Sequence, residues 1–205
     1  MAVGQGSAAQ LQAMAACFFM RKRAYHPATI ISVGVGSAPE IDIWHWLLPK
    51  VQIVGIDPRH PLGNIPPEHY TEAAAGSGIN SDVHFCRCCR STACVDDRHP
   101  RRGTSPVVTV DSVASKYPGP YFLWMDCEGA EIEALAGASE TLKQTRWLSA
   151  EVRDFAWDAN YAEKLDARLR ALGYGVFFNG YGADRLYWKR RFKGSNGPVA
   201  AGENR

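Results

Sequence analysis

The sequence lacks the features that would place the protein in a membrane or on a nucleic acid. Its most apolar N-terminal run, residues 11–20, is interrupted by Gln12, is too short to span a bilayer and precedes its basic residues, the reverse of a secretory signal. The formal net charge is only +2, so charge indicates no nucleic-acid partner. We therefore expect a cytoplasmic protein with a small-molecule substrate and no membrane or nucleic-acid partner; the sequence leaves its oligomeric state open.

The six cysteines also lack the two Cys-x-x-Cys pairs of ordinary zinc sites, because only Cys86 and Cys89 have that spacing. Four of them occur in one segment, at positions 86, 88, 89 and 94. On a strand, Cys86 and Cys88 would face one way and Cys89 the other, so they do not converge on one metal ion. Without an export signal a disulfide framework is not expected either, and buried or edge thiols are favoured.

The length of 205 residues, 46% of them hydrophobic, is enough for one complete core. We assign residues 1–28 to an N-terminal extension, residues 29–193 to one domain and residues 194–205 to a flexible tail. Within the extension, Leu11, Met14 and Phe18 occur at helical spacing and predict a short helix that packs on the domain through these side chains.

The first part of the domain has the pattern of a strand, a glycine turn, a helix and a second strand. Residues 29–33 are apolar and β-branched and end at Gly34 and Gly36. Ile41 and Trp44 then fall on one helix face, and residues 51–56 form the second apolar run. Such a βαβ unit predicts an α/β fold with a parallel sheet.

The remaining elements follow from the same patterns. Further strands are predicted at residues 83–89, 107–110, 121–125, 147–150, 175–178 and 185–188, the last two as an antiparallel pair. Helices are predicted around 67–75, from 129 to 142 and over 162–172, with a charged loop at 96–105.

In such sheets ligands bind outside the carboxyl ends of the strands, which is where the first candidate site lies. Gly34, Val35 and Gly36 form the first turn, and Ser37 caps the next helix, so backbone N–H groups face a ligand. Asp57, followed by Pro58, ends the second strand, where a carboxylate can bind both ribose hydroxyls of an adenosine cofactor. A turn without a ligand is the alternative. Pro39, at the third position of a dinucleotide fingerprint, argues against NAD.

The second candidate site consists of three carboxylates. Asp126 and Glu151 end consecutive strands, and Glu128 lies two residues after Asp126. Clustered carboxylates have raised and split pKa values, so we predict Glu128 as a general base, Asp126 as the group that orients cofactor or acceptor, and Glu151 as the third member. A simple acidic cap of the following helix is the alternative. No third ligand accompanies Asp126 and Glu151, so no metal is predicted.

Three segments carry a family resemblance: Val107-Val108-Thr109-Val110-Asp111-Ser112-Val113, then Trp124-Met125-Asp126-Cys127-Glu128-Gly129-Ala130-Glu131, then Gly137-Ala138. Together they resemble the FkbM family of S-adenosylmethionine-dependent methyltransferases. The resemblance implies a Rossmann-like class I methyltransferase sheet, seven-stranded and mostly parallel with an antiparallel last strand, and helices on both faces. It also implies S-adenosyl-L-methionine as cofactor and methylation of a hydroxyl oxygen on a sugar or small natural product.

Two positions depart from this family. Ser32 replaces an acidic residue that contacts the methionine amino group of the cofactor, and Trp124 replaces a lysine. These departures leave open a Rossmann-fold binding module without catalysis. A nicotinamide-dependent oxidoreductase is the other alternative, against which Pro39 and the lack of a Tyr-x-x-x-Lys pair both speak.

Overall fold

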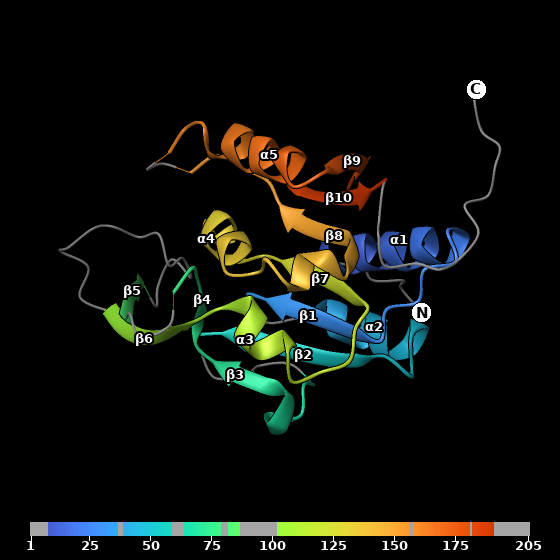
Figure 1. Cartoon of the computed structure of the whole chain (residues 1–205), viewed down its shortest axis with the longest axis horizontal. Helices are drawn as coiled ribbons and strands as arrows, with labels where there is room; N and C mark the ends of the chain where they lie inside the picture. Colours follow the sequence, from blue (N-terminus) through green and yellow to red (C-terminus); the bar gives the residue numbers. More distant parts are fainter. Residues whose placement is uncertain are drawn as a thin grey trace, which may run out of the picture.

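The computed structural model describes residues 8–36, 39–58, 64–78, 82–86, 102–155, 158–180 and 182–190. Its centre is a seven-stranded sheet in the order β3-β2-β1-β7-β8-β10-β9 (Figure 1). These strands are β1 (Thr29–Val33), β2 (Gln52–Asp57), β3 (Tyr70–Glu72), β7 (Tyr121–Met125), β8 (Thr145–Glu151), β9 (Tyr174–Asn179) and β10 (Asp184–Lys189). Only β10 runs against its neighbours, which confirms the predicted mostly parallel sheet with an antiparallel last strand.

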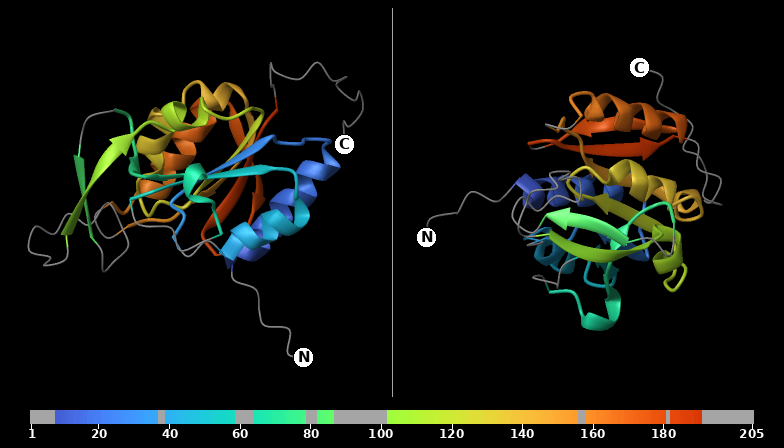
Figure 2. Two further views of the ribbon diagram at one scale, coloured as in Figure 1. Left: turned by 90° about the horizontal axis from the view of Figure 1, so that it is seen from below. Right: turned by 90° about the vertical axis from the view of Figure 1, so that its left-hand side faces the viewer.

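Helices cover both faces of this sheet, as predicted. Helices α1 (Ala8–Lys22) and α2 (Pro39–Leu47) lie on one face, and α3 (Val110–Ala114), α4 (Glu131–Ala136) and α5 (Tyr161–Ala171) lie on the other (Figure 2, left). Because strand side chains alternate, neighbouring residues enter different cores. Ile30, Phe122 and Trp147 pack under α1 and α2. Their neighbours along the strands enter the core under α3, α4 and α5.

Helix α1 packs through a different face from the one predicted. Leu11, Met14 and Phe18 are 36%, 43% and 54% exposed. The side chains that α1 buries are smaller or lie between these positions: Gln12, Ala13, Ala16, Cys17 and Met20. The two alanines let the helix approach the sheet and α2 closely. Because α1 is apolar on nearly every side, periodicity could not select the buried face.

A second, three-stranded sheet corrects the predicted boundaries in the middle of the chain. It consists of β4 (Ala74–Ala75), β6 (Arg102–Val108) and β5 (Asp82–Cys86), in that order. The predicted loop at 96–105 therefore ends in a strand, and Val110 begins α3, which Thr109 caps by accepting the N–H of Ser112. The predicted helix at 67–75 is only a 3-10 turn, Pro67–His69, followed by β3 and β4. Cys88, Cys89 and Cys94 lie outside the described residues.

The predicted long helix after residue 129 is divided in two. Helix α4 ends at Ala136, and a 3-10 turn, Thr141–Lys143, follows. A Cβ at Gly137 would lie 2.0 Å from the carbonyl oxygen of Gly76, so this close approach requires glycine and accounts for the Gly137-Ala138 pair. The helix predicted at 162–172 is confirmed as α5. Within the described ranges, no helix is long and apolar enough to cross a bilayer.

Candidate active site

The glycine turn after β1 touches the end of β7. Gly34 has a positive φ of 81°, and an added Cβ would lie 1.9 Å from the carbonyl oxygen of Asp126. The Asp126 N–H in turn donates to the carbonyl oxygen of Val33 at 2.9 Å. Only glycine fits this contact, which holds the glycine turn against the acidic turn at residues 126–129.

Asp57, at the end of β2, accepts a hydrogen bond from the same turn. Its side chain is 1% exposed, and its Oδ2 accepts the N–H of Gly36 at 3.0 Å. Gly36 also has a positive φ, of 53°, and Val35 between the two glycines is buried. Ser37 lies outside the described residues. The predicted ribose contact of Asp57, with Pro58 next to it, stays a prediction, and the structure adds that Asp57 shapes the turn.

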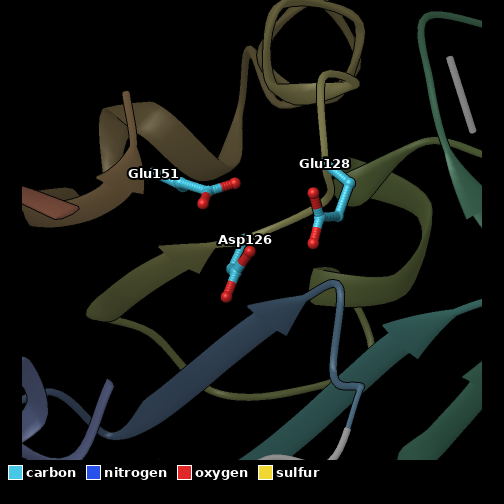
Figure 3. Close-up of side chains that lie close together, drawn as sticks. All are labelled: Asp126, Glu128 and Glu151. Atoms are coloured by element: carbon cyan, nitrogen blue, oxygen red, sulfur yellow. The ribbon is translucent and has the colours of Figure 1, made fainter. Parts of the chain in front are cut away.

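The sheet brings the predicted carboxylates together at its carboxyl edge. Strands β7 and β8 are parallel neighbours with Met125 opposite Ala150, so Asp126 and Glu151 follow at the next position on both strands. Carboxylate oxygens of Asp126, Glu128 and Glu151 all lie within 4.8 Å of one another, and the three side chains converge (Figure 3). The prediction that these strands are neighbours is confirmed.

A fourth carboxylate, Asp184, was missed in the sequence. Asp184 is the first residue of β10 and pairs with Glu151 across the sheet. Strand alternation directs Asp126, Glu151 and Asp184 to the face that α1 and α2 cover. The signal was available: an antiparallel strand begins at the edge where its parallel neighbours end, so its first residue belongs to the same site.

Burial shifts the titration of these groups toward neutral pH. It raises the pKa of Asp126 to about 7, with Asp184 and Glu128 adding negative charge nearby. Burial also raises the pKa of Glu151 to about 8, with a contribution from Asp126, and that of Asp184 to about 6. The ligand-free site therefore holds protons at neutral pH and is suited to a positively charged ligand.

Arg153, also missed in the sequence, balances part of this charge at the rim. Its Nη2 forms an ion pair with Oε2 of Glu128, and its Nε lies 3.2 Å from Oε2 of Glu151. Arg153 is 43% exposed and follows β8 by two residues. Glu128, the predicted base, is therefore already engaged by a cation in this structure.

The shape of the acidic turn is fixed by Glu131. Glu128 and Gly129 both have positive φ, 56° and 99°. The Glu131 carboxylate accepts the N–H groups of Cys127 at 3.0 Å and Gly129 at 3.1 Å, and the hydroxyl of Tyr161 donates to it at 2.9 Å. The helix-cap interpretation of the acidic turn thus applies to Glu131, while Asp126 and Glu128 face the site.

The three converging carboxylates also have the spacing of a metal site. Glu128, predicted above as a base rather than as a ligand, is the third oxygen donor of this group. Arg153 already pairs with two of the three carboxylates, so a metal ion would have to displace it. We therefore retain the prediction of a site without metal.

Comparison with known proteins finds a family similarity over part of the chain. Residues 95–176 match the methyltransferase FkbM domain, which includes the acidic turn and Glu151. A solved structure with similarity is the plantazolicin methyltransferase BpumL in complex with SAH, at a TM-score of 0.46 and 10% identity, over 89% of this chain and 84% of that one. The comparison with curated proteins finds no match. The match over residues 95–176 covers less than half of the chain and agrees with the resemblance that the acidic turn carries.

Proposed function

We propose that the protein methylates a hydroxyl oxygen on a sugar or another small natural product. The similarity of residues 95–176 to the methyltransferase FkbM domain supports S-adenosylmethionine as the methyl donor, and the hydroxyl acceptor is a further step of the proposal. The observation that carries the proposal is the convergence of Asp126, Glu128 and Glu151 at the carboxyl edge of the sheet. A hydroxyl group must lose a proton as its oxygen is methylated, and a carboxylate with a raised pKa is suited to accept it.

The residues of this edge fit S-adenosylmethionine. Gly34 lets the glycine turn lie directly against Asp126, and we expect Asp57 at the end of β2 to bind the ribose of the adenosine part. Val35, Gly36, Ser37 and Pro58 complete the proposed binding turn. The bound donor supplies an activated methyl group on a positively charged sulfur, and the carboxylates supply the negative charge that such a cation requires.

The ion pair of Glu128 supports a division of roles that differs from the one predicted. Arg153 forms an ion pair with Glu128 and also lies 3.2 Å from Oε2 of Glu151, yet burial still raises the pKa of Glu151 to about 8. A cation bound next to Glu151 lowers this pKa and converts the side chain to the carboxylate. Glu151 then accepts the hydroxyl proton as the new oxygen–carbon bond forms and the carbon–sulfur bond breaks, with its electron pair left on sulfur. Asp126 orients the reactants.

Two measurements test this proposal. Calorimetric titration should show that S-adenosylmethionine and S-adenosylhomocysteine bind the wild type, that NAD does not, and that Asp57→Ala weakens binding. A screen of hydroxyl, amine and thiol acceptors with methyl-labelled donor should then give labelled hydroxyl compounds, with turnover lost in Glu151→Gln. The exposed Glu133 on α4 provides a matched control, Glu133→Gln. Labelling of amines or thiols alone, or full turnover in Glu151→Gln, contradicts the proposal.

A further inference from the structure

Glu40 is a buried carboxylate without a positive partner among the described residues. It is the second residue of α2 and is only 3% exposed. Its carboxylate is hydrogen-bonded by its own backbone N–H, and burial raises its pKa to about 7. Burying an unpaired carboxylate is costly, so a group of this kind normally has a positively charged or hydrogen-bonding partner.

Glu40 belongs to the carboxylate group of the active site. Helix α2 covers the sheet face to which Asp126 and Asp184 point, and it begins shortly after the glycine turn. The negative charges of Asp126 and Asp184 both act on Glu40 and add to the rise of its pKa. Glu40 therefore faces the same site from the helix side, opposite the carboxylates that the strands provide.

Buried polar atoms next to these carboxylates also lack partners. Ser32 Oγ and Trp124 Nε1 belong to residues paired in register on β1 and β7, one step before Gly34 and Asp126 on the same face. Both side chains are at most 1% exposed. The Ser32 hydroxyl, without a partner among the described residues, is thus available to a polar ligand, whereas Trp124 packs edge-on against Trp44 as a core residue.

Gln12 on α1 provides another unpartnered acceptor on this face. It is fully buried, its Nε2 donates to Ser149 Oγ at 3.1 Å, and its Oε1 has no partner. That oxygen would lie 1.8 Å from a Cβ at Gly180, whose N–H bonds the carbonyl oxygen of Asp184. The missing partner of such an oxygen is an N–H donor.

We propose that Glu40 binds the α-ammonium group of the methyl donor, with the Gln12 carbonyl oxygen as a further acceptor on the same face. The inference rests on the proposed cofactor site. The donor has two positive centres: its sulfonium must lie close to the acceptor and hence to Asp126 and Glu151, which leaves its ammonium group for Glu40. Ser32, where the resembling family has an acidic residue, offers only an uncharged hydroxyl. The negative charge for the ammonium group has thus moved from β1 to α2.

Three ligands distinguish this role from a helix-capping role. S-adenosylmethionine has both cations, S-adenosylhomocysteine has only the ammonium group, and methylthioadenosine lacks the amino-acid part. Calorimetry should show that Glu40→Gln lowers the affinity for the first two ligands roughly 10- to 100-fold, which is the loss expected for a hydrogen bond to a charged group. Methylthioadenosine should keep its affinity, which also shows that the variant is folded. The control is Asp42→Asn, an exposed carboxylate in the same helical turn.

Other outcomes overturn the inference. Unchanged affinity for S-adenosylhomocysteine with weaker S-adenosylmethionine binding places Glu40 at the sulfonium instead. An equal loss for methylthioadenosine, or the same losses in Asp42→Asn, makes Glu40 a structural cap of α2. A wild type that binds none of the three ligands refutes the proposed cofactor site itself, a result distinct from failure of the Glu40 variant alone.

Discussion

Replacing Asp126 with asparagine should stabilise the ligand-free protein while it impairs donor binding. The pKa of Asp126 is raised from 3.8 to about 7, mainly by burial. At about 1.4 kcal/mol per pH unit, its ionised form costs about 4 kcal/mol on folding. Asparagine has nearly the same shape and no charge. Because Glu151 and Asp184 share the repulsion and the new amide needs partners of its own, we expect a net gain of about 2 kcal/mol in the free energy of unfolding above neutral pH.

The pH dependence of this gain has a definite sign. Between the unfolded and folded pKa values the folded protein holds the proton that the unfolded chain has lost, so the stability of the wild type falls as pH rises. Between pH 5.5 and pH 7 this loss is about 2 kcal/mol from Asp126 alone, and above pH 8 it levels off. The variant lacks this titration. Its advantage over the wild type should therefore be larger at pH 8.5 than at pH 5.5.

Urea unfolding of the ligand-free proteins at these two pH values measures the difference. The six tryptophans provide a fluorescence signal, and the exposed Glu133→Gln variant controls for the loss of a carboxylate as such. A constant difference between wild type and Asp126→Asn at both pH values, or a variant that is less stable at pH 8.5, would refute the argument that the carboxylates are held together at a cost.

Further predictions follow from the same site. Affinity for the methyl donor should increase from pH 6 to pH 8.5, because a bound cation displaces the protons of the carboxylates. Calorimetry at pH 7 in two buffers of different ionisation enthalpy should show that binding releases protons. Proton uptake on binding would contradict this prediction. Gly34→Ala should lower the free energy of unfolding by several kcal/mol and abolish donor binding, since its Cβ would lie 1.9 Å from the Asp126 carbonyl oxygen; urea unfolding checks this against Gly78→Ala, a position with open space. Tyr161→Phe should lower the free energy of unfolding by about 1 kcal/mol, because it removes the hydroxyl group that donates to Glu131. It should also reduce turnover more than it reduces the affinity for S-adenosylhomocysteine. Unchanged turnover would mean that the acidic turn keeps its shape without this hydrogen bond.

The parallel strands and their carboxyl ends could be predicted because the signals are local. Buried runs followed by Gly34, Asp57 or Asp126 show where strands stop, and parallel neighbours place such residues at one edge. Asp184 could have been predicted from the reversed last strand as well, but the sequence pattern placed the start of that strand one residue later, at 185. The sequence also could not show that Gly137 stops α4, because the reason is a contact with Gly76, sixty-one residues earlier in the chain.

The partners of charged groups were the least predictable part. Arg153 reaches Glu128 only because the chain after β8 returns over the acidic turn. Glu40 has the sequence signature of an ordinary first-turn residue in a helix, and only its burial on the active-site face sets it apart. The buried face of α1 was equally hidden, since the small side chains of Ala13 and Ala16 decide how closely it approaches the sheet.

The place of β10 in the sheet affects how the protein is completed during synthesis. β10 follows β9 in the chain, yet it lies between β8 and β9 in the sheet and packs against α1. A nascent chain that ends before Asp184 therefore leaves the edges of β8 and β9 unpaired, a state prone to aggregation. The carboxylate site lacks Asp184 until β10 has entered the sheet, so a chain terminated before Asp184 should aggregate and should not bind the methyl donor.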